Sequence, residues 1–177
     1  MWAKIESDTI TGLIPRPKAI AIGDVQYPHN IFGLWSVAEL EAIGIYEVII
    51  DNTNLKDNNY YTNTDITYAY DSGAATGSYD TAPAKDLDQL KDKHKRLINR
   101  EAYNALEDSD WLVIRAAEGG TAVPSAWTTY RAAVRTKSND METLIDAAAN
   151  VDALAALYVE SGDPLTRPLG EWPSKPE

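Results

Sequence analysis

The sequence predicts an α+β protein in which a small β-rich module precedes a helical module. In the first half of the chain, short apolar runs alternate with glycine, proline and polar turns, a pattern typical of strands. In the second half, residues 84–107, which follow Pro83, contain no glycine or proline, and their apolar residues recur at helical spacing. We therefore expect a β-rich module over residues 1–82, a helical module over 83–160 and an extended tail over 161–177.

The β-rich module is predicted to contain short strands joined by tight turns. Residues 19–22 form an apolar run, and the turn dipeptide Gly23-Asp24 follows it. Residues 66–70 alternate between apolar and polar or small side chains, which is the period of a strand. The return strand, residues 74–81, has a weaker signal because Gly77 interrupts it.

One short helix is predicted inside this module. Ser36 and Glu39 have the S-x-x-E spacing of a capping box, in which two side chains satisfy backbone N–H groups at the start of a helix. Gly44 lies where a residue in the left-handed conformation commonly ends a helix. The apolar run over residues 45–50 then predicts a strand.

The second module is predicted to be a helical hairpin or bundle. A helix over residues 83–107 would span ~36 Å, so it should pack on another helix or on a second subunit. Residues 124–149 show the spacing of a second long helix, and Asn150 can cap a last short one. Residues 111–114 fit either the end of a helical pair or a brief strand.

Charge and composition exclude several classes of function. The chain holds 16 Lys and Arg against 27 Asp and Glu, a net charge of −11, which disfavours binding to nucleic acid or to an anionic membrane. No run reaches the ~20 apolar residues of a membrane helix, and we expect a soluble protein without a secretion signal. The absence of cysteine excludes disulfides and thiolate metal sites.

The sequence contains no recognisable catalytic, cofactor or metal-binding motif. His29 and His94 lie far apart, which does not suit a site built from several histidines. Gly119-Gly120 lacks the lysine and the spacing of a phosphate loop, and the polar loop 51–59 lacks the spacing of a calcium loop. The basic run 91–100 is interpreted as a solvated helix face, with docking to an acidic partner as the alternative. We therefore expect no enzyme activity and no cofactor.

The aromatic residues point towards contact with other molecules. The chain has 10 Tyr and 5 Trp but a single Phe. Tyr and Trp combine a large apolar body with a polar group, which suits protein interfaces and stacking on carbohydrate. Tyr68 and Tyr70 lie on one face of a predicted strand, where they either cover the sheet or form an exposed interface.

Three segments resemble proteins of tailed bacteriophages. Residues 35–48 resemble the W(S/T)-x-x-E-L-x-x-(I/L)-G-(I/L)-Y-x-V segment of tail and fibre-associated proteins. Residues 110–135 resemble their later D-W-x-V-x-R-x-x-E … (V/I)-P-x-x-W-x-x-Y-R-x-x-(V/L)-R segment, and residues 172–176 resemble the W-P-x-K-P ending of some tail-fibre-assembly proteins. The residues that carry these matches are Trp35, Gly44, Tyr46, Trp111, Arg115, Pro124, Trp127, Tyr130, Arg131, Arg135 and Trp172.

The resemblance implies a non-enzymatic structural component of the virion, made in the host cytoplasm and located in the tail, neck or fibre-attachment region. Its partners would be other tail or fibre proteins. A homo-oligomer is expected from the long helix, and a trimer by analogy to phage fibres. The additional helical segment 141–160 resembles virion structural proteins more than assembly proteins. A tail-fibre assembly chaperone and a carbohydrate-binding receptor module that uses Tyr68 and Tyr70 are the alternatives.

Overall fold

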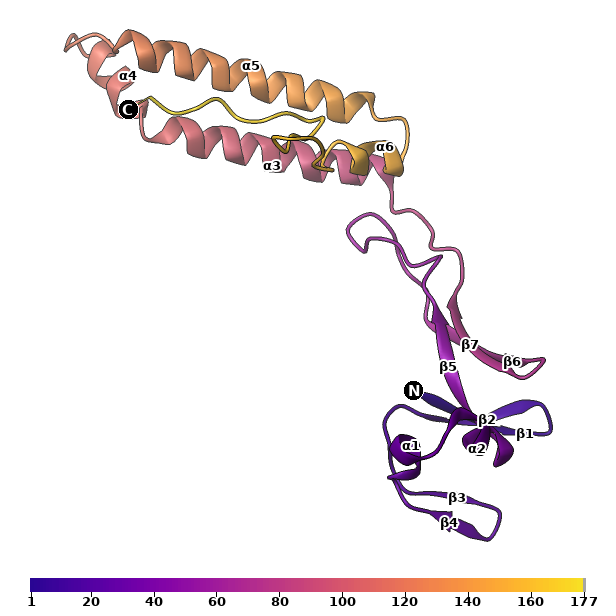
Figure 1. Ribbon diagram of the computed structural model, residues 1–177. Coiled ribbons are helices and arrows are strands. Elements are labelled where there is room, and N and C mark those ends of the chain that lie inside the picture. Colours follow the sequence, from indigo (N-terminus) through magenta and orange to yellow (C-terminus); the bar gives the residue numbers. More distant parts are fainter. Residues whose placement is uncertain (177) are drawn as a thin grey trace. The chain divides into compact units, whose positions relative to one another are not determined.

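The computed structural model describes residues 1–176 and divides the chain into two compact units, Met1–Pro83 and Ala84–Glu177 (Figure 1). The first unit is built around a β-sheet and the second is helical, which confirms the predicted α+β class. The division falls one residue after the predicted one. The segment predicted to be an extended tail belongs to the second unit, where Leu169 is fully buried.

The first unit contains a curled sheet with the strand order β2-β1-β5-β7-β6. Its strands pair antiparallel except for β5 and β7, which run parallel. The bounds are β1 (Trp2–Glu6), β2 (Thr9–Ile14), β5 (Ile45–Asp51), β6 (Ile66–Asp71) and β7 (Ala74–Tyr79). A separate hairpin joins β3 (Ile20–Ile22) and β4 (Val25–Tyr27), with Gly23 in the left-handed conformation at its predicted turn.

The predicted short helix is α2 (Val37–Ala42), and its capping box is present. The Ser36 hydroxyl accepts a hydrogen bond from the Glu39 N–H, and the Glu39 carboxylate accepts one from the Ser36 N–H at 2.8 Å. Gly44 follows the helix with a φ of +79°. A Cβ at this position would lie 2.8 Å from the Ile5 carbonyl oxygen, so glycine is required both for the turn and for the approach of β1.

The prediction of one short helix in this unit is wrong, because a second one, α1 (Ile31–Leu34), precedes α2. Helix α1 is a single turn whose N-cap, Asn30, makes no side-chain capping bond, and it contains Gly33, so it carries no local signal. It is held instead by burial of Ile31 and Phe32. Tertiary packing therefore decides the conformation of this segment.

Strands β1 and β2 were also absent from the sequence prediction. The turn between them places Ser7 and Asp8 at positive φ, without the glycine that usually marks such a hairpin.

In β7, the interrupting Gly77 has a packing role. A Cβ there would lie 2.8 Å from Ile50 Cδ1 and 3.0 Å from Tyr68 Cε1, so the glycine makes room for these side chains.

The second unit is an antiparallel hairpin of two long helices, α3 (Leu87–Glu107) and α5 (Ser125–Ala147), joined through α4 (Asp110–Ala117) (Figure 1). Helix α3 begins later than predicted because Asp86 caps it, accepting a bond from the Gln89 N–H at 2.8 Å. Residues 111–114 are helical rather than a strand. The last helix, α6 (Val151–Ala156), is capped by Asn150 as predicted. Within residues 1–176, no helix is long and apolar enough to cross a bilayer.

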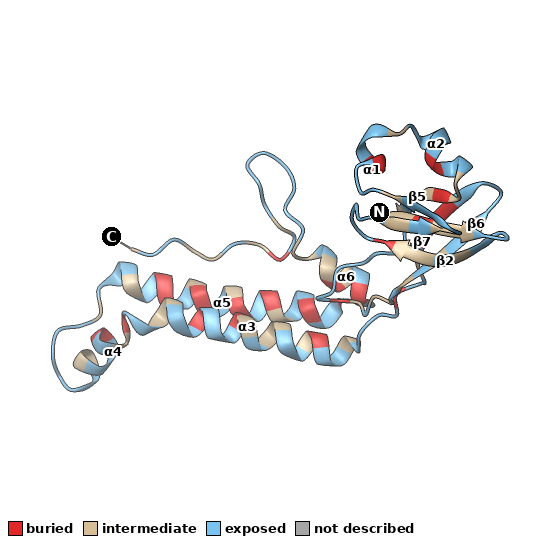
Figure 2. Ribbon diagram, turned by 90° about the horizontal axis from the view of Figure 1, so that it is seen from below, coloured by how far each residue is buried: buried red, intermediate tan, exposed pale blue. Residues whose placement is uncertain are grey.

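The buried faces of α3 and α5 meet along the hairpin (Figure 2). Ile98 and Ala102 of α3 are buried, as are Val134, Met141 and Ile145 of α5. Because α5 covers α3 inside the chain, the length of α3 does not by itself require a second subunit. The homo-oligomer stays a prediction.

Part of the basic run is used inside the helical unit. Lys91 Nζ donates to the Asp146 carbonyl oxygen at 2.9 Å, and Lys95 Nζ pairs with the Asp146 carboxylate at 2.9 Å. Asp146 lies in the last turn of α5, where backbone carbonyls lack helical partners and a cation is favourable. These contacts agree with the interpretation of this run as an ordinary helix face.

We predict that Gly44→Ala lowers the free energy of unfolding of the first unit by about 2 kcal/mol, because it forces an alanine into positive φ and against the Ile5 carbonyl. Urea denaturation followed by circular dichroism measures the effect. Gly33→Ala is the matched control, since a Cβ there meets nothing within 4 Å. Equal stability of the two variants would contradict the prediction.

We also predict that His94 makes the helical unit less stable as the pH falls. Burial, with a smaller effect of the Lys93 charge, lowers the pKa of His94, whose ring centre lies 4.6 Å from that of Tyr158. Between about pH 7.5 and pH 5.5 the unfolded chain takes up a proton at His94 (ordinary pKa about 6.5) before the folded chain does, so stability is lost. Denaturation at both pH values should show a smaller loss for His94→Gln than for the control His29→Gln.

Candidate functional site

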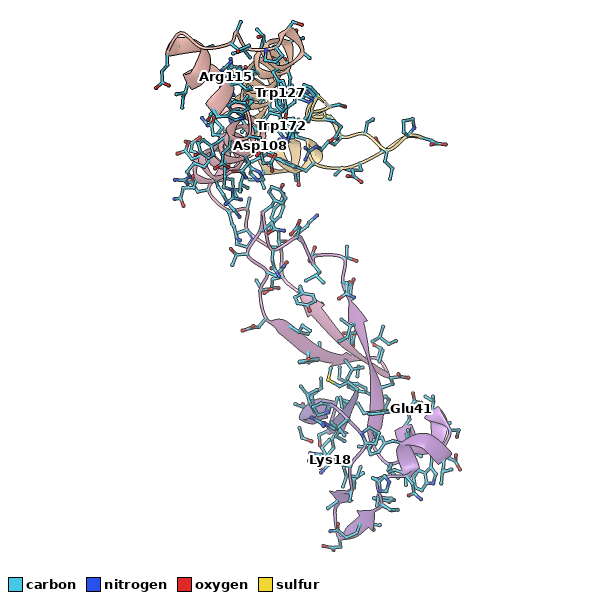
Figure 3. All side chains as sticks on the ribbon, turned by 90° about the vertical axis from the view of Figure 1, so that its left-hand side faces the viewer. Lys18, Glu41, Asp108, Arg115, Trp127 and Trp172 are labelled. Carbon is cyan, nitrogen blue, oxygen red and sulfur yellow. The ribbon has the colours of Figure 1, made fainter. Side chains whose placement is uncertain are left out.

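Most residues of the later resemblance segment come together at one end of the helical unit. The C-terminal turn of α3, the whole of α4, the first half of α5 and the last residues of the tail form this end (Figure 1). We call it the hairpin end and define it as residues 101–118, 123–135 and 172–176. Figure 3 labels four of its side chains, Asp108, Arg115, Trp127 and Trp172.

Arg131 of α5 lies buried at the junction of α3 and α4, with 7% of its surface exposed. Its Nη1 donates to the Leu106 carbonyl oxygen at 2.9 Å and to the Ser109 hydroxyl at 2.6 Å, and its Nη2 pairs with the Asp110 carboxylate at 2.8 Å. A cation at the C-terminal end of α3 also complements the helix dipole. One guanidinium thus ties α5 to the end of α3 and to the start of α4.

The neighbouring aromatic residues complete this junction. The Tyr130 hydroxyl donates to the Ala105 carbonyl oxygen at 3.2 Å. Two consecutive residues of α5, Tyr130 and Arg131, therefore donate hydrogen bonds to carbonyl oxygens in the last turn of α3. The rings of Trp127 and Tyr130 meet edge to face, with their centres 5.8 Å apart. Together with Ala102 and Val134, Tyr130 forms a small apolar cluster.

The tail is fastened to the same place. Trp172 packs against the Ala102–Tyr130–Val134 cluster, and its Nε1 donates to the Glu101 carboxylate at 2.8 Å. Lys175 pairs with Asp108 and lies 5.7 Å from the centre of the Trp127 ring. The tryptophan of the W-P-x-K-P ending is therefore a structural anchor of the helical unit.

Helix α4 presents an apolar surface on the outside of the hairpin end. It buries Leu112, whereas Trp111 is 56% exposed, Ile114 is 58% exposed and Val113 is also exposed. The Arg115 guanidinium lies over Trp111, 4.6 Å from the ring centre. We call Trp111, Val113 and Ile114 the α4 face. These three exposed side chains lie outside the Ala102–Tyr130–Val134 cluster that holds the hairpin end together.

A pocket of about 230 Å³ lies beside this face, between α4 and α5. Its lining includes Val113, Val123 and Thr128 together with the two arginines Arg131 and Arg135. Arg135 is exposed, and its Nη1 donates to the Arg131 carbonyl oxygen at 3.5 Å. Between residues 1 and 176, no carboxylate lies within salt-bridge distance of Arg135. No motif or spacing in the sequence predicts this pocket.

The residues of the first resemblance segment lie in the other unit and have packing roles. Trp35 packs against the core beneath α1 and α2, with its ring centre 5.7 Å from that of Tyr27. Tyr46 meets Tyr70 edge to face at 4.8 Å, and their hydrogen bond, with smaller effects of burial and nearby charges, raises the pKa of Tyr70 to about 12. Tyr68 and Tyr70 are half-buried and pack against a small cluster formed by Ala3 of β1, Val48 of β5 and Ala75 of β7.

The remaining predicted site residue, Pro124, precedes the first residue of α5, and its carbonyl oxygen accepts from the Thr128 N–H at 3.0 Å. Its fixed φ suits the start of a helix.

In the part of the chain that the structure describes, no three His, Asp or Glu side chains are arranged to hold a metal ion. The candidate site consists of the α4 face and the pocket beside it.

We predict that Arg131→Lys lowers the free energy of unfolding of the helical unit by about 2–4 kcal/mol. A lysine cannot donate in a fork to Leu106, Ser109 and Asp110, so buried acceptors lose their partners. Urea denaturation measured by near-UV circular dichroism reports the change. Arg96→Lys, at an exposed position of α3, is the control and should change stability by less than about 0.5 kcal/mol. A similar small change in Arg131→Lys would refute the role of the junction.

The resemblance to phage proteins covers segments of both units, residues 35–48 in the first and 110–135 and 172–176 in the second. In comparisons with protein-family models, with curated proteins and with solved structures, the chain found no match. Membership of a phage family therefore stays a prediction from these segments.

Proposed function

We propose that this protein is a non-enzymatic structural component of a tailed-phage virion, in the tail, neck or fibre-attachment region, that works by binding other tail or fibre proteins. The observation that carries the proposal is the convergence at the hairpin end. Residues of two separate resemblance segments, 110–135 and 172–176, meet there beside an exposed apolar helix face.

The hairpin end has the physical properties of a protein-binding surface. Trp and Arg are enriched at interfaces and among the residues that contribute most to binding energy, and Trp111 and Arg115 lie together on α4. The helix that carries them is fixed from behind by Arg131 and Ser109. A rigid surface loses little conformational entropy on binding, which favours affinity.

The assembly chaperone is the nearest alternative, because it would use the same surface but leave before the particle is complete. The carbohydrate-binding alternative depends on Tyr68 and Tyr70. Both rings are half-buried against the sheet core, so they offer a sugar less aromatic surface than fully exposed rings would. We therefore keep the structural role as the proposal.

The first test is quantitative mass spectrometry of purified infectious particles from a tailed phage that encodes this chain. We expect its peptides at a fixed molar ratio to the known tail proteins. The ratio would give the copy number, and therefore test the oligomer. Abundance in the infected-cell lysate combined with absence from particles would refute the structural role and favour the assembly chaperone.

The second part of the test asks whether the α4 face makes the contact. In phage that lack the native gene, a Trp111→Glu, Ile114→Glu double variant should fold normally but enter particles at least about tenfold less than the native chain, because two charges replace an apolar contact. Val159→Glu, at an equally exposed apolar position outside the hairpin end, is the matched control. Normal incorporation of the double variant would show that the contact lies elsewhere.

A further inference from the structure

We infer that the pocket between α4 and α5 binds a carboxylate side chain of a partner polypeptide, with an apolar neighbour of that side chain seated on the α4 face. This inference rests on the proposed function, because the partner is taken to be another protein of the same particle. It adds the chemistry of the segment that docks and names Arg135 as the residue that recognises it.

The positive charge of Arg135 is not balanced by an acidic side chain of the described residues. Arg131, which also lines the pocket, is buried, and its charge is balanced by Asp110, 2.8 Å from its Nη2. Arg135 is exposed, and within the described chain no acidic side chain pairs with it. Its hydrogen bond to the Arg131 carbonyl oxygen, at 3.5 Å, is long, which leaves most of its donors available to a ligand.

The charge balance of the pocket selects a singly charged anion. Arg131 and Arg135 contribute two positive charges and Asp110 one negative charge, so one positive charge is left uncompensated. A carboxylate would neutralise it and can accept two parallel bonds from one guanidinium. A phosphate dianion would bring an excess negative charge close to Asp110, which is unfavourable.

The apolar part of the site indicates a polypeptide rather than a small ion. Val113 and Val123 line the pocket, and Val113 also belongs to the α4 face with Trp111 and Ile114. A ligand that fills the pocket therefore has an apolar surface next to its charge. A peptide in which Asp or Glu is flanked by large apolar residues carries both features on one strand of chain.

The surrounding charge makes this recognition selective. The chain has a net charge of −11, so acidic segments are repelled by most of its surface. An acidic partner segment is attracted only where positive charges lie close together, as Arg131 and Arg135 do in this pocket. General repulsion combined with local attraction favours specificity of position.

The inference is tested by fluorescence anisotropy with the full chain and a set of short labelled peptides. Each peptide carries one glutamate between two leucine, isoleucine or phenylalanine residues, and its partner peptide carries glutamine instead. We expect the best glutamate peptides to bind about tenfold or more tightly than their glutamine partners. Arg135→Gln should abolish this preference, whereas the control Arg96→Gln, at an exposed arginine of α3, should keep it.

Three results would overturn the inference. These are failure of every glutamate peptide to bind, equal binding of glutamate and glutamine peptides, and an unchanged preference in Arg135→Gln. Displacement of a bound glutamate peptide by inorganic phosphate at an equal concentration would also overturn it, because the site would then be a small-anion site.

Incorporation into particles separates this inference from the proposed function. If the native chain is present in particles and Arg135→Gln enters them equally well, the recognition of a carboxylate is wrong and the structural role stands. If the chain selects glutamate peptides but is absent from particles, the structural role is wrong and the binding site stands. Circular dichroism of Arg135→Gln confirms that the exposed substitution leaves the fold intact.

Discussion

The helical unit depends on one buried cation at the place where its two long helices are joined. Removing a guanidinium from water is costly, and the cost is offset only if its donors find acceptors in good geometry. Arg131 finds a backbone carbonyl, a buried hydroxyl and a carboxylate, all from the short stretch between Leu106 and Asp110. This set of partners exists only when α3 ends at the observed residue and α4 leaves in the observed direction. The ion therefore specifies the geometry of the junction as well as stabilising it.

The rest of the hairpin end follows from that geometry. With α3 and α5 held together, Ala102, Tyr130 and Val134 form a cluster against which Trp172 can pack, and the tail becomes part of the unit. With α4 held by its first residue, its apolar side chains cannot all turn inward, because successive side chains of a helix point in different directions. Leu112 is buried, while Trp111, Val113 and Ile114 are exposed. The contact between Arg131 and Asp110 that fixes α4 on the unit therefore also leaves the α4 face exposed on its outer side.

Features set by residues close together in the chain could be predicted from the sequence, whereas features set by contacts between distant residues could not. The capping box at Ser36, the αL residue Gly44 and the cap at Asn150 were predicted correctly because each acts within a few residues. Helix α1 was missed because burial of Ile31 and Phe32, rather than a local motif, holds it. The β1–β2 turn was missed because Ser7 and Asp8 adopt positive φ without a glycine to mark it. The pocket was missed because periodicity places Arg131 on a helix without showing that its partners lie more than twenty residues earlier in the chain.

Some residues of the resemblance segments have a clear role in holding the fold together, whereas others do not, and only the second group bears on function. Gly44, Trp127, Tyr130, Arg131 and Trp172 are each required by packing, a hydrogen bond or a backbone conformation in this chain. A fold alone accounts for them, whatever the protein binds. Trp111 and Arg135 have no such requirement, since the first is largely exposed and the second has no acidic partner in the described chain. The contacts that these two residues make within the chain, a stacked Arg115 for Trp111 and a long hydrogen bond for Arg135, contribute little to stability and do not explain their place in the resemblance segment. Contact with another molecule would explain it, so these two residues, more than the buried ones such as Tyr130 and Arg131, support the proposed binding role.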